Sequence, residues 1–191
     1  MNHPGTHKVR ELIPGLLDDY LSFFDGDAFA DHPEWAFCYC RLHHFPHEQR
    51  KWRDTTAIEN REAVIRLIND GTLRGFLAYC DDRPVGWCNA GPRSRMTTVP
   101  EYDEPEADQI GSIMCFVVTK EHRRLGVARQ LLEAACRGFA AQGLKFAEGY
   151  PLKDVEGESA NHCGPLDLYL SAGFERYWED EDVIVVRRSL D

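Results

Sequence analysis

The sequence has no long apolar run and no surplus of positive charge, and each absence excludes a class of protein. No stretch of the 191-residue chain approaches the ~20 apolar residues of a membrane-spanning helix, so we expect no membrane span. Residues 1–10 lack the apolar segment of a secretory signal, so we expect a cytoplasmic protein. The 22 basic residues are outnumbered by 32 acidic ones, a net charge of −10. This balance argues against nucleic acid or an anionic membrane as a partner, because both require a basic face.

The rest of the composition is that of an ordinary globular protein. Hydrophobic residues make up 43% and charged residues 28% of the chain, which is typical of folded domains. A chain of this length buries about 70% of its unfolded surface, enough for one core. We therefore expect one domain over 1–191, with a helical N-terminal part over 1–74 and a core over 75–191. The odd number of cysteines, seven, indicates reduced thiols.

The N-terminal third is predicted to be mainly helical. A short extended piece over 9–13 comes first, and apolar residues within 17–24 then follow at helical spacing, i, i+3, i+4 and i+7. The aromatic run 35–40 is predicted to be a strand or a loop. A second helix is predicted over 57–69, where an Asp-Gly pair ends it.

The remainder of the chain alternates strands with helices. We predict two helices, over 126–142 and 166–172, the first ended by Gly143 in the left-handed conformation. The predicted strands are 76–80, 85–89, 113–118, 146–150, 174–178 and 183–187. Because helices cross between strands, the predicted fold class is α/β, with helices packed on one mixed sheet.

One segment carries recognisable chemistry. The apolar strand at 113–118 leads into a basic turn, and the turn opens a long helix. The first amides of a helix lack internal partners and carry a partial positive charge. Gly126 lets a ligand approach the backbone, and Arg123 and Arg124 add positive charge. This pattern predicts a site for an anion such as a pyrophosphate, although solvated arginines at a strand–helix corner are the alternative.

Two motifs resemble the GNAT superfamily of N-acetyltransferases. Arg123-x-x-Gly-x-Ala128 after an apolar strand resembles that family's coenzyme A signature, and Tyr169-Leu-Ser-Ala-Gly-Phe174 resembles its late Tyr-x-x-x-Gly-Phe element. The resemblance covers 75–188. It implies a mixed, mostly antiparallel sheet that is flanked by helices and splayed at the cofactor slot. It also implies an acetyl-CoA-dependent N-acetyltransferase for a primary amine of a small molecule, and a homodimer is a common assembly in the family.

The resemblance also assigns roles to individual residues. The strand residues Phe116, Val117 and Val118 would pair with the pantetheine arm. The pyrophosphate would be held by the turn, that is by Arg123, Arg124, Leu125, Gly126, Val127 and Ala128. The Val118 amide would polarise the thioester carbonyl. Tyr169 would be the general acid, since a phenol remains protonated at neutral pH; a helix tyrosine packed on the core is the alternative.

The general base is where this sequence departs from the family pattern. Many members carry a glutamate on the strand before the turn, but residues 111–118 contain no carboxylate. Glu148 on the next strand is our first candidate, and an outward-facing charge is the alternative interpretation. His162 and a chain of water molecules are further candidates. An amine that arrives neutral needs no base.

Other side chains offer weaker signals. Four aromatic residues are candidates for an acceptor pocket, since aromatic faces attract cations, but ordinary core packing is the favoured explanation for each: Trp35, Trp87, Tyr102 and Tyr150. A group of zinc-ligand types occurs at short spacing: Cys38, Cys40, His43, His44 and His47. No second cysteine pair follows at finger spacing, and alternate residues share one face of a strand, so we expect no metal. Cys163 has no apparent base and is not expected to be a nucleophile.

Three rival functions remain open at this stage. The missing strand carboxylate fits a non-catalytic acyl-CoA-binding sensor module, which would bind the cofactor without turnover. A protein lysine or N-terminal acetyltransferase would present an open groove in place of a closed pocket. A plain interaction domain would show no affinity for coenzyme A.

Overall fold

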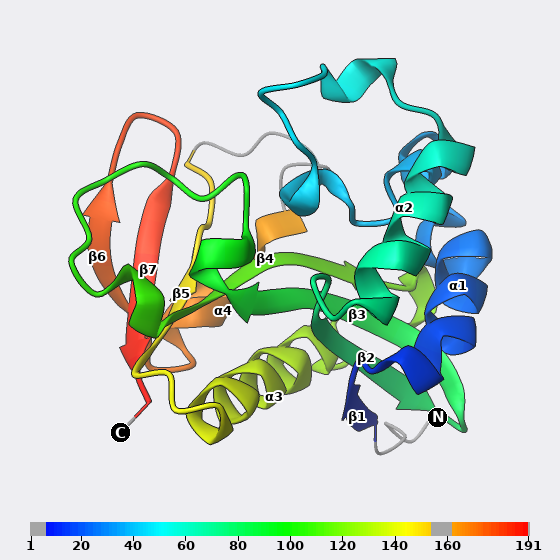
Figure 1. The fold of residues 1–191 in the computed structure, drawn as a ribbon. Helices are drawn as coiled ribbons and strands as arrows, with labels where there is room; N and C mark the ends of the chain where they lie inside the picture. The colour runs from blue at the N-terminus through cyan, green and yellow to red at the C-terminus, as the bar shows by residue number, and fades with distance from the viewer. Residues whose placement is uncertain (1–6, 154–161, 191) are drawn as a thin grey trace.

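The computed structural model describes residues 7–153 and 162–190, which form a seven-stranded sheet flanked by helices (Figure 1). The strand order is β1-β2-β3-β4-β5-β7-β6. The strands are β1 Lys8–Glu11, β2 Gly75–Cys80, β3 Arg83–Pro92, β4 Ile110–Val118, β5 Phe146–Gly149, β6 Glu175–Glu179 and β7 Ile184–Ser189. Among the described strands, only β4 and β5 pair in parallel, and every other pair is antiparallel. The predicted mixed, mostly antiparallel sheet is confirmed.

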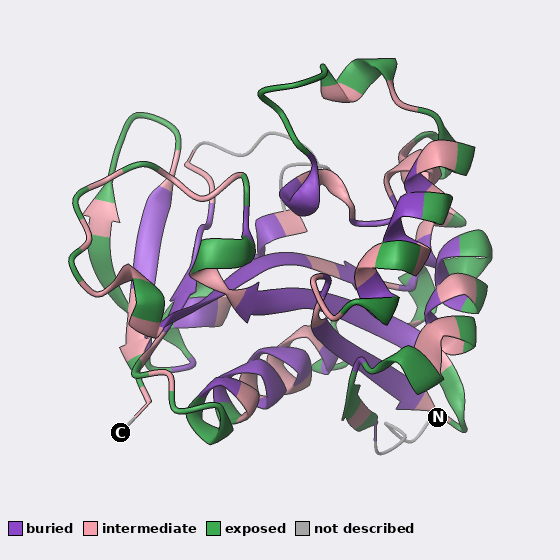
Figure 2. Ribbon diagram, in the orientation of Figure 1, coloured by how far each residue is buried: buried purple, intermediate pink, exposed green. Residues whose placement is uncertain are grey.

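Helices cover both faces of this sheet (Figure 1). The helices are α1 Leu17–Asp25, α2 Ala57–Asn69, α3 Val127–Ala141 and α4 Leu166–Leu170. Neighbouring residues of a strand point to opposite faces: Trp87 of β3 packs in the apolar cluster with α1 and α2, whereas Cys88 packs in the cluster with α3. The central strands β2, β3, β4 and β5 therefore form a buried middle layer, whereas the edge strands β1 and β6 are mainly exposed (Figure 2).

Local signals set the ends of the two long helices. Thr56 caps α2 in a capping box, in which its hydroxyl accepts from the Glu59 amide and the Glu59 carboxylate accepts from the Thr56 amide. Gly143 follows α3 with φ +78°, the left-handed conformation that stops a helix. Both helices lie within a residue of their predicted bounds because these signals are local.

The aromatic run 35–40 differs from its prediction as a strand or loop. It belongs to a 3-10 helix, Pro33–Cys38, and Tyr39 and Cys40 then adopt positive φ values of 46° and 52°. Proline at the first position favours a helical turn there. Cys38 and Cys40 consequently share no strand face. All seven cysteines are free thiols in this structure.

Within the part of the chain that the structure describes, no helix is both long enough and apolar enough to cross a bilayer.

Candidate functional site

The site begins where β4 and β5 separate. These strands pair only from Ile110 to Ile113, and Gly149, the partner of Ile113, is the last residue of β5. β4 continues to Val118 alongside β3 alone. A β-bulge at Met114 comes just before the part of β4 that does not pair with β5. The bulge follows from the register with β3, in which Asn89 lies opposite Cys115 but Ala90 lies opposite Ile113, so Met114 has no partner. The predicted splay between the two strands is confirmed.

The free edge of β4 presents backbone hydrogen-bonding groups. Thr119 donates its N–H to the Val85 carbonyl at 3.0 Å, and hydrogen-bonded positions alternate along an antiparallel pair. Phe116 and Val118 therefore direct their N–H and C=O groups away from β3, toward the space that β5 leaves. The Val118 carbonyl accepts from Arg123 Nε at 3.1 Å. The remaining groups suit an extended ligand lying along the strand.

A cavity of about 560 Å³ lies along this edge, a volume typical of small-molecule sites. One wall is β4 and the following turn. The opposite wall comes from the N-terminal third and is mainly aromatic: Phe29, Trp35, Phe37 and Trp52. Cys38, Cys40, His43 and His162 also line the cavity.

An adjoining cavity of about 270 Å³ surrounds the start of α3. The turn uses two positive φ values, 62° at Arg124 and 83° at Gly126. The first helical bond runs from Gln130 N to Gly126 O at 3.1 Å, so the N–H groups of residues 127–129 lack an acceptor within the helix. The N-terminus of a helix with such groups attracts anions.

Most residues predicted to bind the cofactor meet at these cavities. The larger cavity is lined by Phe116, Val117, Val118, Arg123, Arg124 and Ala128. The smaller one adds Gly126 and Val127. Leu125 lines neither and its side chain is exposed.

Arg123 also forms an ion pair with the N-terminal third of the chain. Its guanidinium forms two bonds with Asp31, at 2.6 and 3.0 Å. The hydrogen bond from Arg123 lowers the pKa of Asp31. This ion pair ties the aromatic N-terminal wall to the turn, a contact that the sequence analysis missed because the partners lie 92 residues apart.

Tyr169 is fully buried and packs against Gly164, a residue that lines the larger cavity. Its hydroxyl donates to the Cys163 carbonyl at 2.6 Å, and burial raises the pKa of Tyr169 well above its usual range. A Cβ added at Gly149 would lie 2.8 Å from this hydroxyl. The phenol group is therefore at the point where β4 and β5 part, although it lines neither cavity.

Glu148 is placed differently from both interpretations of the sequence. It is 0% exposed, so it is no outward-facing charge, and it lines neither cavity. Its carboxylate accepts from Arg187 Nε at 2.8 Å, from the Tyr102 hydroxyl at 2.7 Å and from the Tyr150 hydroxyl at 3.0 Å. Arg93 lies 3.7 Å away. These contacts describe a buried ion-pair network.

The other aromatic candidates divide between the cavity and the core. Trp35 lines the cavity. Trp87 belongs to the core beneath α1, and Tyr102 and Tyr150 pack in a smaller cluster beside β7. For these three, core packing is the explanation that fits the structure.

The Cys/His segment does not gather into a ligand set. His43 contacts the Thr98 hydroxyl, His44 contacts Asn89 and His47 contacts the Leu42 carbonyl. Burial, with nearby histidines, lowers the pKa of His43 to about 3. Burial also raises the pKa of Cys163 to about 12, the opposite of an activated nucleophile.

The aromatic wall contains the residues that sequence reasoning missed. Phe29, Phe37 and Trp52 lie in or beside short 3-10 turns, which have no apolar periodicity to mark a common face. The abundance of aromatic residues between the two predicted N-terminal helices was the only available signal.

The fold and the two cavities define an α/β protein in which a strand–helix turn with unpaired amides lies beside an open strand edge. Residues 27–149 match the model of the acetyltransferase (GNAT) family. Since this match covers more than half of the chain, the protein belongs to the GNAT acetyltransferase family. It is therefore an acyltransferase, and acetyl-CoA is its co-substrate.

Solved structures agree with this fold. The GNAT domain of PAT from S. lividans aligns with a TM-score of 0.61 at 15% identity, over 97% of this chain and 91% of that one. An N-acetyltransferase from Staphylococcus aureus Mu50 gives 0.57 at 14%, over 97% and 99%. PaiA N-acetyltransferase from Thermoplasma acidophilum, solved in complex with coenzyme A, gives 0.56 at 12%, over 96% and 99%. No curated protein sequence matches the chain.

Proposed function

We propose that this protein transfers the acetyl group of acetyl-CoA to a primary amine of a small molecule, by direct attack in a ternary complex. The observation that carries the proposal is the 560 Å³ cavity, in which the open edge of β4 faces an aromatic wall. Membership of the family identifies acetyl-CoA as the acetyl donor, and we place the acceptor amine against the aromatic wall. Aromatic faces hold apolar groups and attract ammonium groups.

The cofactor is proposed to lie along the free part of β4. Its pyrophosphate occupies the turn from Arg123 to Ala128, where the unpaired helix amides point and where two residues hold positive φ values. Its pantetheine arm pairs with the free backbone groups of Phe116 and Val118. The thioester then lies near the bulge at Met114, where the strands begin to separate.

The chemical step requires a donor for the oxyanion and an acid for the thiolate. The amine nitrogen attacks the thioester carbon, the carbonyl oxygen becomes an oxyanion, and the C–S bond then breaks. The Phe116 N–H is two residues closer to the point where β4 and β5 separate than the Val118 N–H is. We therefore propose that the Phe116 N–H donates the hydrogen bond that stabilises the oxyanion. Tyr169 is our candidate acid because its hydroxyl lies where β4 and β5 part; it lines neither cavity, so to protonate the departing thiolate it must exchange its bond to the Cys163 carbonyl for one to the sulfur.

The proton of the attacking amine needs an acceptor within the cavity. Glu148 lies outside the cavity, whereas His43 and His162 both line it, with ring centroids 6.2 Å apart. A histidine with a pKa of about 3, such as His43, is a weak proton acceptor at neutral pH. We therefore propose His162 as the general base.

The proposal is tested by calorimetric titration of acetyl-CoA, followed by a screen of amines for release of free thiol. We expect saturable binding and turnover on a small amine. Binding without turnover on any amine would instead support the sensor module. Turnover on peptides alone would support a protein acetyltransferase. Absence of acetyl-CoA binding would overturn the proposal.

We expect Tyr169→Phe to lower kcat by about 100-fold, within the usual range for a general acid. The variant also loses the buried hydrogen bond to Cys163, so a stability cost of about 1–3 kcal/mol is expected. Steady-state kinetics across pH, with a melting curve, separate the two effects. Tyr177→Phe alters a tyrosine that is 48% exposed and is the matched control. Undiminished turnover of Tyr169→Phe at every pH would rule out the acid role.

A further inference from the structure

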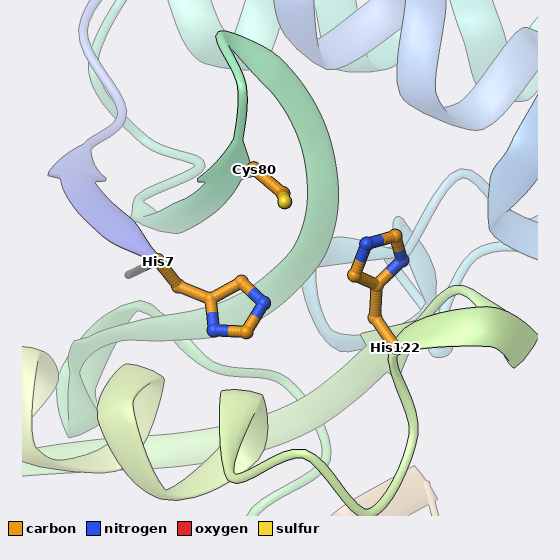
Figure 3. A group of neighbouring side chains, drawn as sticks. All are labelled: His7, Cys80 and His122. Carbon is orange, nitrogen blue, oxygen red and sulfur yellow. The ribbon is translucent and has the colours of Figure 1, made fainter. Parts of the chain in front are cut away.

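Three side chains from distant parts of the sequence meet at one edge of the sheet: His7, Cys80 and His122 (Figure 3). His7 directly precedes β1, Cys80 ends β2, and His122 ends the 3-10 turn Lys120–His122. Their ligand atoms, two ring nitrogens and one sulfur, all lie within 4.8 Å of one another. Figure 3 shows the three side chains converging on one space, and each ring turns a nitrogen into it.

These donors are the types that zinc-like ions prefer. Zn²⁺ binds imidazole nitrogen at about 2.0–2.1 Å and thiolate sulfur at about 2.3 Å, usually in a tetrahedron. Ligand atoms of such a tetrahedron are roughly 3.3–3.6 Å apart. The distances between the three ligand atoms, none longer than 4.8 Å, must therefore shorten by at most about 1.5 Å. Small rotations of the three side chains are enough for this change.

A hydrogen bond holds the ring of His122 in the way that the outer hydrogen bond of a metal-ligating histidine usually does. Its Nδ1 lies 2.8 Å from the hydroxyl of Thr119, a buried residue at the end of β4. A bond of this kind fixes the ring and directs Nε2 to a metal. A carboxylate oxygen of Asp81 lies 3.9 Å from the Cys80 sulfur, and its negative charge favours a cation beside it.

We propose that His7, Cys80 and His122 bind one divalent transition-metal ion of the zinc type, with the fourth position taken by water. The ion joins β1, the end of β2 and the segment that leads into the anion-binding turn. Among the described strands, β1 pairs with β2 alone at the edge of the sheet and has only four residues, so a metal bond at His7 adds a further attachment for this short strand. This inference does not depend on the proposed acetyl transfer.

The test is titration of Co²⁺ into the reduced full-length chain, without chelating reductants. Cobalt reports its ligands, because a thiolate ligand gives a charge-transfer band and a tetrahedral site gives strong visible bands. We expect one ion per chain, displaced by Zn²⁺. Cys80→Ser should lose the charge-transfer band and His122→Ala should bind at least ~100-fold more weakly, more than removal of an outer partner costs. Cys38→Ser and His47→Ala are matched controls that should bind as the wild type does.

A second variant keeps the test decisive if loss of a ligand disturbs folding. Thr119→Val preserves side-chain shape and removes only the bond to His122, so we expect the thiolate band to persist while affinity falls about 10- to 100-fold. Unchanged affinity in Thr119→Val would contradict the assigned role of this positioning residue. Absence of saturable binding in the wild type, or a thiolate band that survives in Cys80→Ser, would overturn the site.

Discussion

Ala128→Asp is expected to abolish acetyl-CoA binding while the protein remains folded. Ala128 lies in the first turn of α3 and lines both cavities, where we place the pyrophosphate. Two like charges about 4 Å apart repel by about 4 kcal/mol at an effective dielectric constant of 20, which corresponds to more than a hundredfold in Kd. An acidic residue in the first turn also interacts favourably with the helix dipole, so the loss would not arise from unfolding.

Calorimetric titration and a melting curve measure binding and folding separately. Ala128→Asn matches the size of the aspartate without its charge, so we expect a much smaller loss of affinity. Ala140→Asp places the same charge at an exposed position near the other end of α3 and should bind as the wild type does. Wild-type affinity in Ala128→Asp would show that the cofactor does not use this turn.

Glu148→Gln is expected to destabilise the fold by about 3–5 kcal/mol, the usual cost of breaking a buried ion pair on one side. The carboxylate is fully buried and faces two arginines, Arg187 and Arg93. Neutralising it leaves their positive charge with less compensation in a medium of low polarity. For a chain of this size the change corresponds to a fall in Tm of roughly 6–20 °C.

The same variant decides between the two roles that have been considered for Glu148. A structural role predicts a lower Tm, with kcat close to the wild-type value at a temperature where the variant is folded. A general base predicts the reverse, a large loss of kcat at unchanged Tm. Glu179→Gln removes a carboxylate whose side chain is 51% exposed and paired with Lys153 and Arg176, and it should cost less than about 1 kcal/mol.

Much of the fold was predictable because its signals are local. The capping box at Thr56 and Glu59 and the left-handed glycine at position 143 involve neighbours in the chain. The turn from Arg123 to Ala128 is equally local, since one helix start supplies the amides and one glycine supplies the backbone freedom. The same holds for β4, whose apolar run indicated a strand buried on both faces.

Side-chain environments were predicted less well because distant residues create them. Residue type and strand position suggested a catalytic or an exposed Glu148. Its actual surroundings depend on Arg187, 39 residues away, which the β5–β7 pairing brings alongside. Trp35 was a candidate for the pocket, but the other aromatic residues of the wall, Phe29, Phe37 and Trp52, escaped prediction for a related reason: their short 3-10 turns have no apolar periodicity that would mark a common face.

The sequence alone thus determined the fold class and the family resemblance, because motifs and apolar spacing within a few residues specify both of them. That the turn from Arg123 to Ala128 binds an anion stays a prediction. The tertiary structure decided which side chains meet. It buried Glu148 in an ion-pair network, linked Arg123 to Asp31, and gathered His7, Cys80 and His122 from three strand and turn ends. Contacts of this kind depend on the order of the strands in the sheet and on the crossovers between them, so residue spacing along the sequence does not reveal them.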